Sequence, residues 1–178
     1  MGLTLLTGGA RSGKSVIAVR SATAWKGPVT LIVTAEDRDE EMREKIARHR
    51  ADRPTGWRVV EEPLALGEAL SATPEDHFVV VDCLTLWVSN LLETGCDAEE
   101  IASRAADAAK LAAARSQPVL VVTNEVGDGI VPMDPATRAY RNLMGTVNAT
   151  FSAAARRAVL VVAGRAIPLE GAEEVIEP

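Results

Sequence analysis

Five short apolar runs, separated by longer stretches of helical composition, constrain the fold of this chain more than any other feature. The runs are LTLLT at 3–7, VTLIVTA at 29–35, FVVVD at 78–82, PVLVVT at 118–123 and AVLVV at 158–162. Runs of this length that are apolar throughout are typical of strands buried on both faces. Because strands that alternate with helices need crossover connections, the sequence predicts an α/β fold with a mainly parallel sheet flanked by helices.

The segments between the runs complete this prediction. RVVEE at 58–62 is a weaker strand candidate, and the C-terminal stretch 164–178 has too weak a pattern to predict an element. A chain of 178 residues is long enough for one well-buried core and short for two, so we expect a single domain over 1–178. Helical composition predicts helices over 13–25, 37–53, 85–93, 98–115 and 135–157.

Composition limits the cellular compartments and the kinds of binding partner that we expect for this protein. A net charge of −6 argues against a general nucleic-acid binder. No apolar run reaches about 18 residues, so no membrane span is expected, and the N-terminus lacks the pattern of a signal peptide. Cys83 and Cys96 have no metal-site spacing with each other or with the histidines. We therefore expect a reduced, cytoplasmic protein in which Cys83 serves packing.

The segment GGARSGKS at 8–15 has the phosphate-binding pattern G-x-x-x-x-G-K-S, and it lies between a predicted strand and a predicted helix. Its glycines allow several backbone N–H groups to point at one anion, next to the positive end of the helix. Lys14 can reach the β- and γ-phosphates of a nucleotide, and the Ser15 hydroxyl can bind Mg²⁺. The alternative is a glycine-rich turn with a chance lysine.

Asp82 ends the apolar run FVVV, where a magnesium-bound triphosphate would require a carboxylate. The alternative is that Asp82 caps a helix that begins near Leu84. We favour the role in binding magnesium or nucleotide.

His49 lies in DRDEEMREKIARHRADR at 37–53, on the same predicted helix face as Met42 and Ile46. Arg48, Arg50 and Arg53 disfavour its protonated form. A neutral imidazole can attack phosphorus, and the arginines could neutralise a phosphoryl group. Taken alone, this stretch fits a histidine in a solvated basic patch better than it fits a nucleophile.

Several motifs together resemble the bifunctional adenosylcobinamide kinase/adenosylcobinamide-phosphate guanylyltransferases of cobalamin biosynthesis. The matching segments are TGGARSGKS at 7–15, DEEMREKIARHRADRPTGWRVVEEP at 39–63, VVVDCLTLWVSNLL at 79–92 and TNEVGDGIVP at 123–132. The resemblance implies a P-loop NTPase (RecA-like) fold. It also implies two reactions: ATP or GTP phosphorylates adenosylcobinamide, and GTP then donates GMP to that phosphate through a histidine phosphoramidate. His49 is the matching histidine.

The resemblance further implies a homotrimer and a set of nucleotide contacts. Glu61 fits this role because a carboxylate can accept hydrogen bonds from guanine N1 and N2, although an exposed strand-end glutamate is the alternative. Magnesium is assigned to Ser15 and Asp82, and catalysis to Lys14 and His49. The implied contacts are Gly8, Gly9, Ala10, Arg11, Ser12, Gly13, Lys14, Ser15, Thr34, Ala35, Glu36, Arg50, Ala51, Asp52, Arg53, Glu61 and Asp82.

Other interpretations stay open. Asn124 and Glu125, in TNEVG, can face phosphates or the acceptor, or can belong to a structural turn. Arg138, Tyr140 and Arg141 can hold an anionic partner or lie on a solvated helix face. For the whole chain, the rivals are a kinase without a covalent intermediate and a nucleotide-dependent switch that acts on a partner.

Overall fold

Seven strands form one sheet in a computed structural model, which describes residues 2–37, 40, 43–44, 54–171 and 175. The strand order is β3-β2-β4-β5-β1-β6-β7, and all neighbours are parallel except β6 and β7. This confirms the predicted mainly parallel sheet. The strands are β1 Leu3–Thr7, β2 Val29–Val33, β3 Arg58–Glu61, β4 Phe78–Asp82, β5 Val119–Val122, β6 Arg157–Val162 and β7 Arg165–Leu169.

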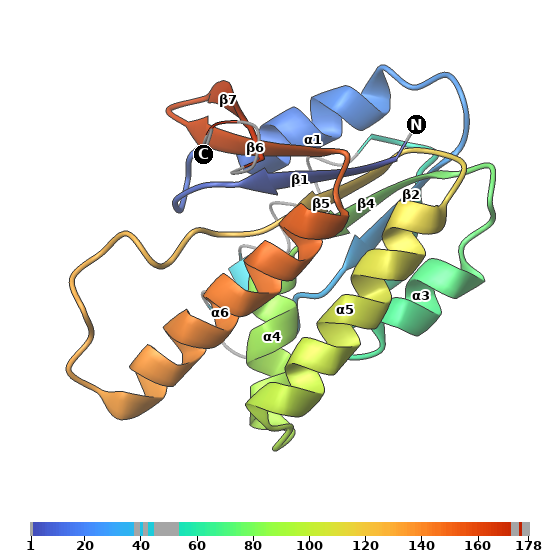
Figure 1. Ribbon diagram of the computed structural model, residues 1–178. Coiled ribbons are helices and arrows are strands. Elements are labelled where there is room, and N and C mark those ends of the chain that lie inside the picture. The colour runs from blue at the N-terminus through green and yellow to red at the C-terminus, as the bar shows by residue number, and fades with distance from the viewer. Residues whose placement is uncertain (1, 38–39, 41–42, 45–53, 172–174, 176–178) are drawn as a thin grey trace.

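Helices cover both faces of the sheet (Figure 1). Successive strand residues point to opposite faces, so Leu5 packs in one core cluster and Leu6 in another. The Leu6 cluster includes residues of α1, whereas the Leu5 cluster includes residues of α3, α4, α5 and α6. The helices are α1 Lys14–Thr23, α3 Leu66–Ala72, α4 Leu84–Glu93, α5 Ala98–Ala114 and α6 Pro135–Ala154.

Side-chain caps explain where two helices begin. The Asp97 carboxylate accepts from the Glu100 N–H at 2.8 Å before α5, and the Asp134 carboxylate accepts from the Thr137 N–H at 2.7 Å before α6. The Thr137 backbone and hydroxyl bonds lower the pKa of Asp134. Pro135 then fits the first position of α6, where its missing N–H has no intrahelical partner in any case.

Two elements were not predicted from the sequence, while the weak candidate at 58–62 is confirmed as β3. Helix α3 buries Leu66, Ala69 and Leu70 but has only seven residues, too few to show a helical period in the sequence. Strand β7 is exposed along its whole length and so lacks an apolar run. The predicted helix over 37–53 lies largely outside the described residues.

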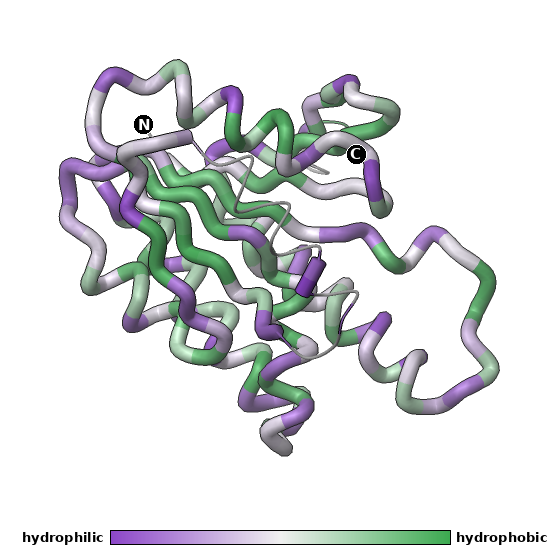
Figure 2. The backbone as a smooth tube through the Cα atoms, turned by 180° about the vertical axis from the view of Figure 1, so that it is seen from behind, coloured by the Kyte–Doolittle hydropathy of each residue, from purple (hydrophilic) through white to green (hydrophobic). Residues whose placement is uncertain are grey.

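The connection from β5 to α6 projects from the body of the molecule (Figures 1 and 2). Figure 2 shows that the strands inside the body are mostly hydrophobic, as strands covered on both faces must be. The projecting connection instead exposes large apolar side chains, with Ile130 97% and Met133 96% exposed. No helix in the described part of the chain is long and apolar enough to cross a membrane.

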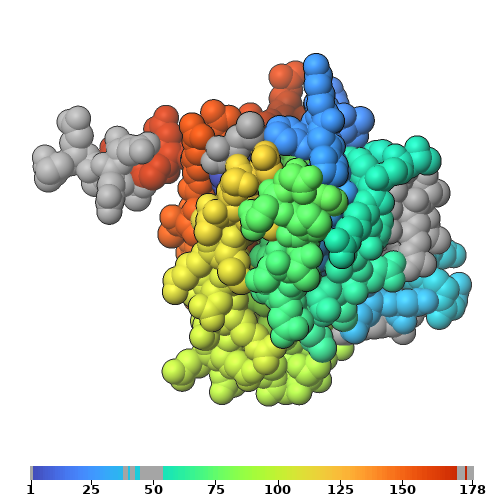
Figure 3. All heavy atoms as spheres, turned by 90° about the vertical axis from the view of Figure 1, so that its right-hand side faces the viewer, coloured from blue at the N-terminus to red at the C-terminus, as the bar shows by residue number. Residues whose placement is uncertain are grey.

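Arg115 joins the end of α5 to the end of α3, where the two helices pack side by side (Figure 3). The side chain is buried, and its Nη1 donates to the carbonyls of Leu70 at 3.1 Å and Thr73 at 3.0 Å. Its Nη2 donates to the Pro74 carbonyl at 2.5 Å. The guanidinium therefore adds a donor to the Leu70 and Pro74 carbonyls, which also accept from the N–H groups of Thr73 and His77, and it is the partner of the Thr73 carbonyl.

Arg115→Ala is expected to lower the free energy of unfolding by about 3 kcal/mol, because three hydrogen bonds from a buried charged group are lost and the Thr73 carbonyl loses its donor. Urea denaturation measures this. Arg104→Ala is the matched control, since Arg104 forms an exposed pair with Glu100 on the same helix; it should change stability by less than about 0.5 kcal/mol. Equal losses of stability in the two variants would contradict the proposed role of Arg115 in joining α5 to α3.

Candidate functional site

Three neighbouring strands end together at one edge of the sheet and define the candidate site. In the register of β4, β5 and β1, Asp82 pairs with Val122 and Leu6 pairs with Val122. The phosphate loop follows β1, and residues 123–125 follow β5. The structure therefore brings Asp82, the TNE segment and the phosphate loop to the same edge, which is where parallel α/β sheets bind ligands.

The phosphate loop is held tightly by the turn between β6 and β7. Gly8 has φ 143°, and a Cβ built on it would lie 2.3 Å from the Val161 carbonyl oxygen. The Gly164 N–H donates to the Ser12 carbonyl at 2.8 Å. Gly13, at φ 103°, is the N-cap residue directly before α1. The loop needs glycine at Gly8 and Gly13 for conformation, and at Gly8 also for space.

Lys14 is buried inside this loop, with only 6% of its surface exposed. Its Nζ donates to the carbonyls of Gly8 and Gly9, each at 2.7 Å, and to the Ser12 hydroxyl at 3.2 Å. Burial lowers the pKa of Lys14, while Cys83 and the nearby Asp82 carboxylate act in the opposite direction. The ammonium group is thus held at the centre of the loop, close to the charge of Asp82.

Asp82 does not cap α4. The residue at the start of that helix is Cys83, and no side chain caps it. The peptide between Asp82 and Cys83 is cis, and Cys83 exchanges two hydrogen bonds with the Thr34 hydroxyl, at 2.7 Å and 2.9 Å. Burial raises the pKa of Cys83 to about 11, so the thiol is neutral near pH 7. This fits the packing role predicted for Cys83.

The segments after β2 and β3 are tied together by Asn90 of α4, a residue that sequence reasoning missed. The Asn90 amide is buried and donates to the carbonyls of Thr34 at 2.7 Å and Pro63 at 3.0 Å. Thr34 is buried, Ala35 and Glu36 are half-buried, and Glu61 is exposed at the last position of β3. The one available signal was a polar residue on the apolar face of α4.

Hydrogen bonds also order the exit from β5. The Thr123 hydroxyl donates to the Asn148 side chain at 2.7 Å, and the Asn124 N–H donates to the Thr85 hydroxyl at 2.9 Å. The Glu125 N–H donates to the Gly8 carbonyl at 3.1 Å. The TNE segment is therefore bonded directly to the phosphate loop, which the sequence alone did not reveal.

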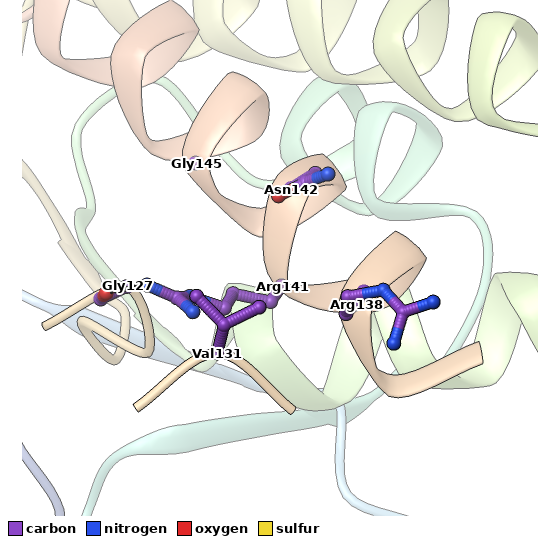
Figure 4. A pocket seen from close by; sticks show the side chains of 6 residues that line it. All are labelled: Gly127, Val131, Arg138, Arg141, Asn142 and Gly145. Carbon is purple, nitrogen blue, oxygen red and sulfur yellow. Dashed lines mark hydrogen bonds between the residues drawn. The ribbon is translucent and has the colours of Figure 1, made fainter. Parts of the chain in front are cut away.

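A pocket of roughly 490 Å³ lies between this exit and α6, and we call it the loop–α6 pocket. Figure 4 shows Arg141 reaching from α6 to Gly127, with Val131 beside it. The Arg141 guanidinium donates to the Gly127 carbonyl, and Arg138 Nη1 donates to the carbonyls of Pro132 at 2.9 Å and Met133 at 2.5 Å. The pocket is lined by Gly127, Val131, Arg138, Arg141, Asn142 and Gly145.

These contacts help to decide whether Arg138 and Arg141 hold an anionic partner or lie on a solvated helix face. Both guanidiniums anchor the projecting loop to α6, so their helix face is not simply solvated. Tyr140 lies between them in the sequence, and its hydroxyl donates to the Thr85 carbonyl at 3.0 Å. Burial, with a smaller contribution from Cys83, raises the pKa of Tyr140 to about 12. Tyr140 is therefore a neutral residue that packs against the core.

Part of the predicted site cannot be placed. His49, Arg50, Ala51, Asp52 and Arg53 lie outside the described residues. Within the described part of the chain, no group of three or more His, Cys, Asp and Glu side chains is arranged to hold a metal ion. Mg²⁺ that arrives with a nucleotide needs only one or two protein ligands, and Ser15 and Asp82 fit that requirement at this edge.

Comparisons with known proteins identify similar sequences and folds. The family model for cobinamide kinase / cobinamide phosphate guanyltransferase matches residues 4–169. A Pseudomonas aeruginosa protein named bifunctional adenosylcobalamin biosynthesis protein CobP is 40% identical over 170 residues, covering 94% of this chain and 96% of its own length. An Escherichia coli K12 protein named bifunctional adenosylcobalamin biosynthesis protein CobU is 39% identical over 184 residues, covering 94% and 99%.

Similarity to a solved structure supports the fold but not the function. The assembled ATPase EscN of the enteropathogenic E. coli type III secretion system superposes with a TM-score of 0.58 at 11% identity, covering 91% of this chain and 43% of EscN. With the mostly parallel sheet and the loop after β1, this confirms the predicted P-loop NTPase (RecA-like) fold.

Proposed function

This chain belongs to the cobinamide kinase / cobinamide phosphate guanyltransferase family, and from that premise we propose that it catalyses both reactions named by the family. A nucleoside triphosphate first phosphorylates adenosylcobinamide. GTP then donates GMP to that phosphate, which yields adenosyl-GDP-cobinamide and pyrophosphate. The observation that carries the proposal is Lys14, buried in its loop beside Asp82 at the shared edge of β1, β5 and β4.

In the first reaction, the loop at 8–15 grips the triphosphate. The acceptor hydroxyl oxygen attacks the γ-phosphorus, and the bond from that phosphorus to the β–γ bridging oxygen breaks. Lys14 and the backbone N–H groups at the start of α1 stabilise negative charge on the transferred group and on the leaving diphosphate. Ser15 and Asp82 would hold Mg²⁺, which would supply further positive charge to the bound triphosphate.

In the second reaction, His49 is the nucleophile. An imidazole nitrogen attacks the α-phosphorus of GTP, and pyrophosphate leaves with the electrons of the broken P–O bond. An oxygen of the acceptor phosphate then attacks the same phosphorus, and the P–N bond breaks to free His49. The loop at 8–15 holds the pyrophosphate portion, so the same cradle serves both reactions.

The remaining nucleotide contacts surround these groups. We assign guanine recognition to Glu61, and further nucleotide contacts to Thr34, Ala35 and Glu36 after β2. Asn90 supports this assignment because it fixes the backbone of both segments at Thr34 and Pro63. Arg50, Ala51, Asp52 and Arg53, which follow His49, complete the proposed set.

We assign the protein to a homotrimer in the cytoplasm. The assembly is supported by exposed apolar side chains on the projecting loop and on β7, where Ile167 is 51% and Leu169 44% exposed. Cys83 and Cys96 are both free, which suits a reducing compartment. Light scattering of the purified protein measures the oligomeric state.

Product analysis tests the function. The purified protein is incubated with adenosylcobinamide and ATP or GTP, and separately with adenosylcobinamide phosphate and GTP. Mass spectrometry should find the phosphate ester in the first reaction, and the GDP derivative with released pyrophosphate in the second. A phosphate ester without GMP transfer would favour a kinase alone. Slow hydrolysis with neither product would favour a nucleotide-dependent switch.

A further inference from the structure

Glu125 stands between the phosphate loop and the loop–α6 pocket. Its backbone N–H donates to the carbonyl of Gly8, which opens the phosphate loop, at 3.1 Å. Its carboxylate oxygen Oε1 accepts from the N–H of Gly127, which lines the pocket, at 2.6 Å. A nucleotide gripped by the loop and an acceptor seated in the pocket would therefore approach each other at Glu125.

The surroundings hold this carboxylate in one orientation. A Cβ built on Gly127 would lie 2.7 Å from Oε1, so the carboxylate lies directly against the backbone of this glycine. Arg141 binds the Gly127 carbonyl from the other side. In the described part of the chain, Oε2 of Glu125 has no hydrogen-bond partner and can accept a proton.

The other described carboxylates near this edge are less suitable. Oε1 of Glu62 already accepts from the N–H groups of Leu64 at 3.0 Å and Ala65 at 2.8 Å, where α3 begins. Glu36 follows β2 and Glu61 ends β3, and these strands are three and four strands from β1 in the sheet. At a spacing of about 4.8 Å per strand, they stand roughly 14 and 19 Å from the phosphate-loop strand.

Glu125 follows β5, which is directly beside β1. Asp82 is the last residue of β4, one strand farther, and its charge lies close to Lys14, where a magnesium ligand is needed. His77 precedes β4 at the opposite edge of the sheet, and its Nδ1 is 2.7 Å from the Thr30 hydroxyl. Glu125 therefore differs from these groups in two ways. It follows the strand next to β1, and its Oε2 has no hydrogen-bond partner in the described part of the chain.

Resting on the proposed function, we propose that Glu125 is the general base of the kinase reaction. As the acceptor oxygen bonds to the γ-phosphorus, its proton passes to Oε2 of Glu125, and the nucleoside diphosphate leaves with the electrons of the broken bond. The guanylyl transfer has no such requirement, because its acceptor is a phosphate oxygen that is already ionised. The two reactions should therefore depend on Glu125 to very different degrees.

Glu125→Gln tests this assignment, because it keeps the shape of the side chain and an oxygen for the Gly127 N–H but removes the base. The kinase kcat should fall by about 10²- to 10⁴-fold, the range that general-base catalysis supplies. The KM for the nucleotide should change little. Guanylyl transfer onto supplied adenosylcobinamide phosphate should stay within a few-fold of wild type. Asp128→Asn, an exposed change of the same kind in the same loop, is the control and should alter neither rate.

A second variant distinguishes loss of the base from a defect in folding. Glu125→Ala should lose the kinase reaction in the same way and regain part of it when formate is added as an external base. A kinase rate near wild type in either variant would overturn the assignment, as would a guanylyl transfer that falls in parallel with the kinase reaction. A wild-type protein that forms no phosphate ester would instead show that the proposed function itself is wrong.

Discussion

Replacing Lys14 by methionine is expected to lower both the kinase and the guanylyltransferase rates by about 10²- to 10³-fold, the size of effect seen when one preorganised charge-stabilising donor is removed. Both reactions are affected because both need the donor's phosphates held in the same loop. Burial lowers the pKa of Lys14, so its environment does not favour the charge for folding. We therefore expect the charge of Lys14 to serve phosphate binding.

Stability should change little in Lys14→Met. The methionine side chain suits a buried position, and the Gly8 carbonyl keeps the N–H of Glu125 as a partner. The Gly9 carbonyl belongs to an exposed residue and can turn to water. Steady-state rates and thermal melting measure the two effects separately. The matched control is Lys26→Met, an exposed lysine beyond α1. Loss of one reaction alone would contradict a shared cradle.

Gly8→Ala is expected to destabilise the protein by about 2–4 kcal/mol and to abolish nucleotide binding. A side chain at φ 143° is strained, and its Cβ would meet the Val161 carbonyl oxygen at 2.3 Å. Because the obstacle is backbone of β6, either the loop or the strand must move. For a chain of this length, the melting temperature should fall by about 5–15 °C.

The neighbouring Gly9 offers a control of the same chemistry. A Cβ at Gly9 would meet nothing within 4 Å, so Gly9→Ala should melt at nearly the wild-type temperature. Differential scanning calorimetry compares the two variants, and titration with a labelled nucleotide reports binding. Equal melting temperatures for the two variants would show that β6 does not constrain the phosphate loop.

Much of the fold could be predicted because the information is local. The buried strands are mostly apolar over their own length, and the segments that form α1, α4, α5 and α6 have helical composition, so each of these elements could be located within a few residues. The exceptions depend on other segments. Helix α3 is held by Arg115, more than forty residues away, and β7 has a partner only in β6. Neither relationship leaves a pattern in the residues concerned.

The same distinction, between local patterns and contacts with distant segments, applies to the candidate site. The phosphate loop and Asp82 could be found because each follows an apolar run, and parallel strands bring such positions to one edge. Contacts between distant segments could not be found. Examples are the hydrogen bond from the Gly164 N–H to the Ser12 carbonyl and the one from the Glu125 N–H to the Gly8 carbonyl. The bonds from the Asn90 amide to two distant carbonyls are another example. These contacts decide how rigid the loop is and which carboxylate stands beside it.

The central claim, that GMP passes through a covalent bond to His49, is tested most directly with GTP labelled at its α-phosphate. Wild-type protein should take up acid-labile, base-stable label while releasing one pyrophosphate per bound GMP, and His49→Ala should take up none. The chain has two histidines, so His77→Ala serves as the control and should be labelled like wild type. Absence of label on the wild-type protein, or equal labelling of His49→Ala, would contradict the account.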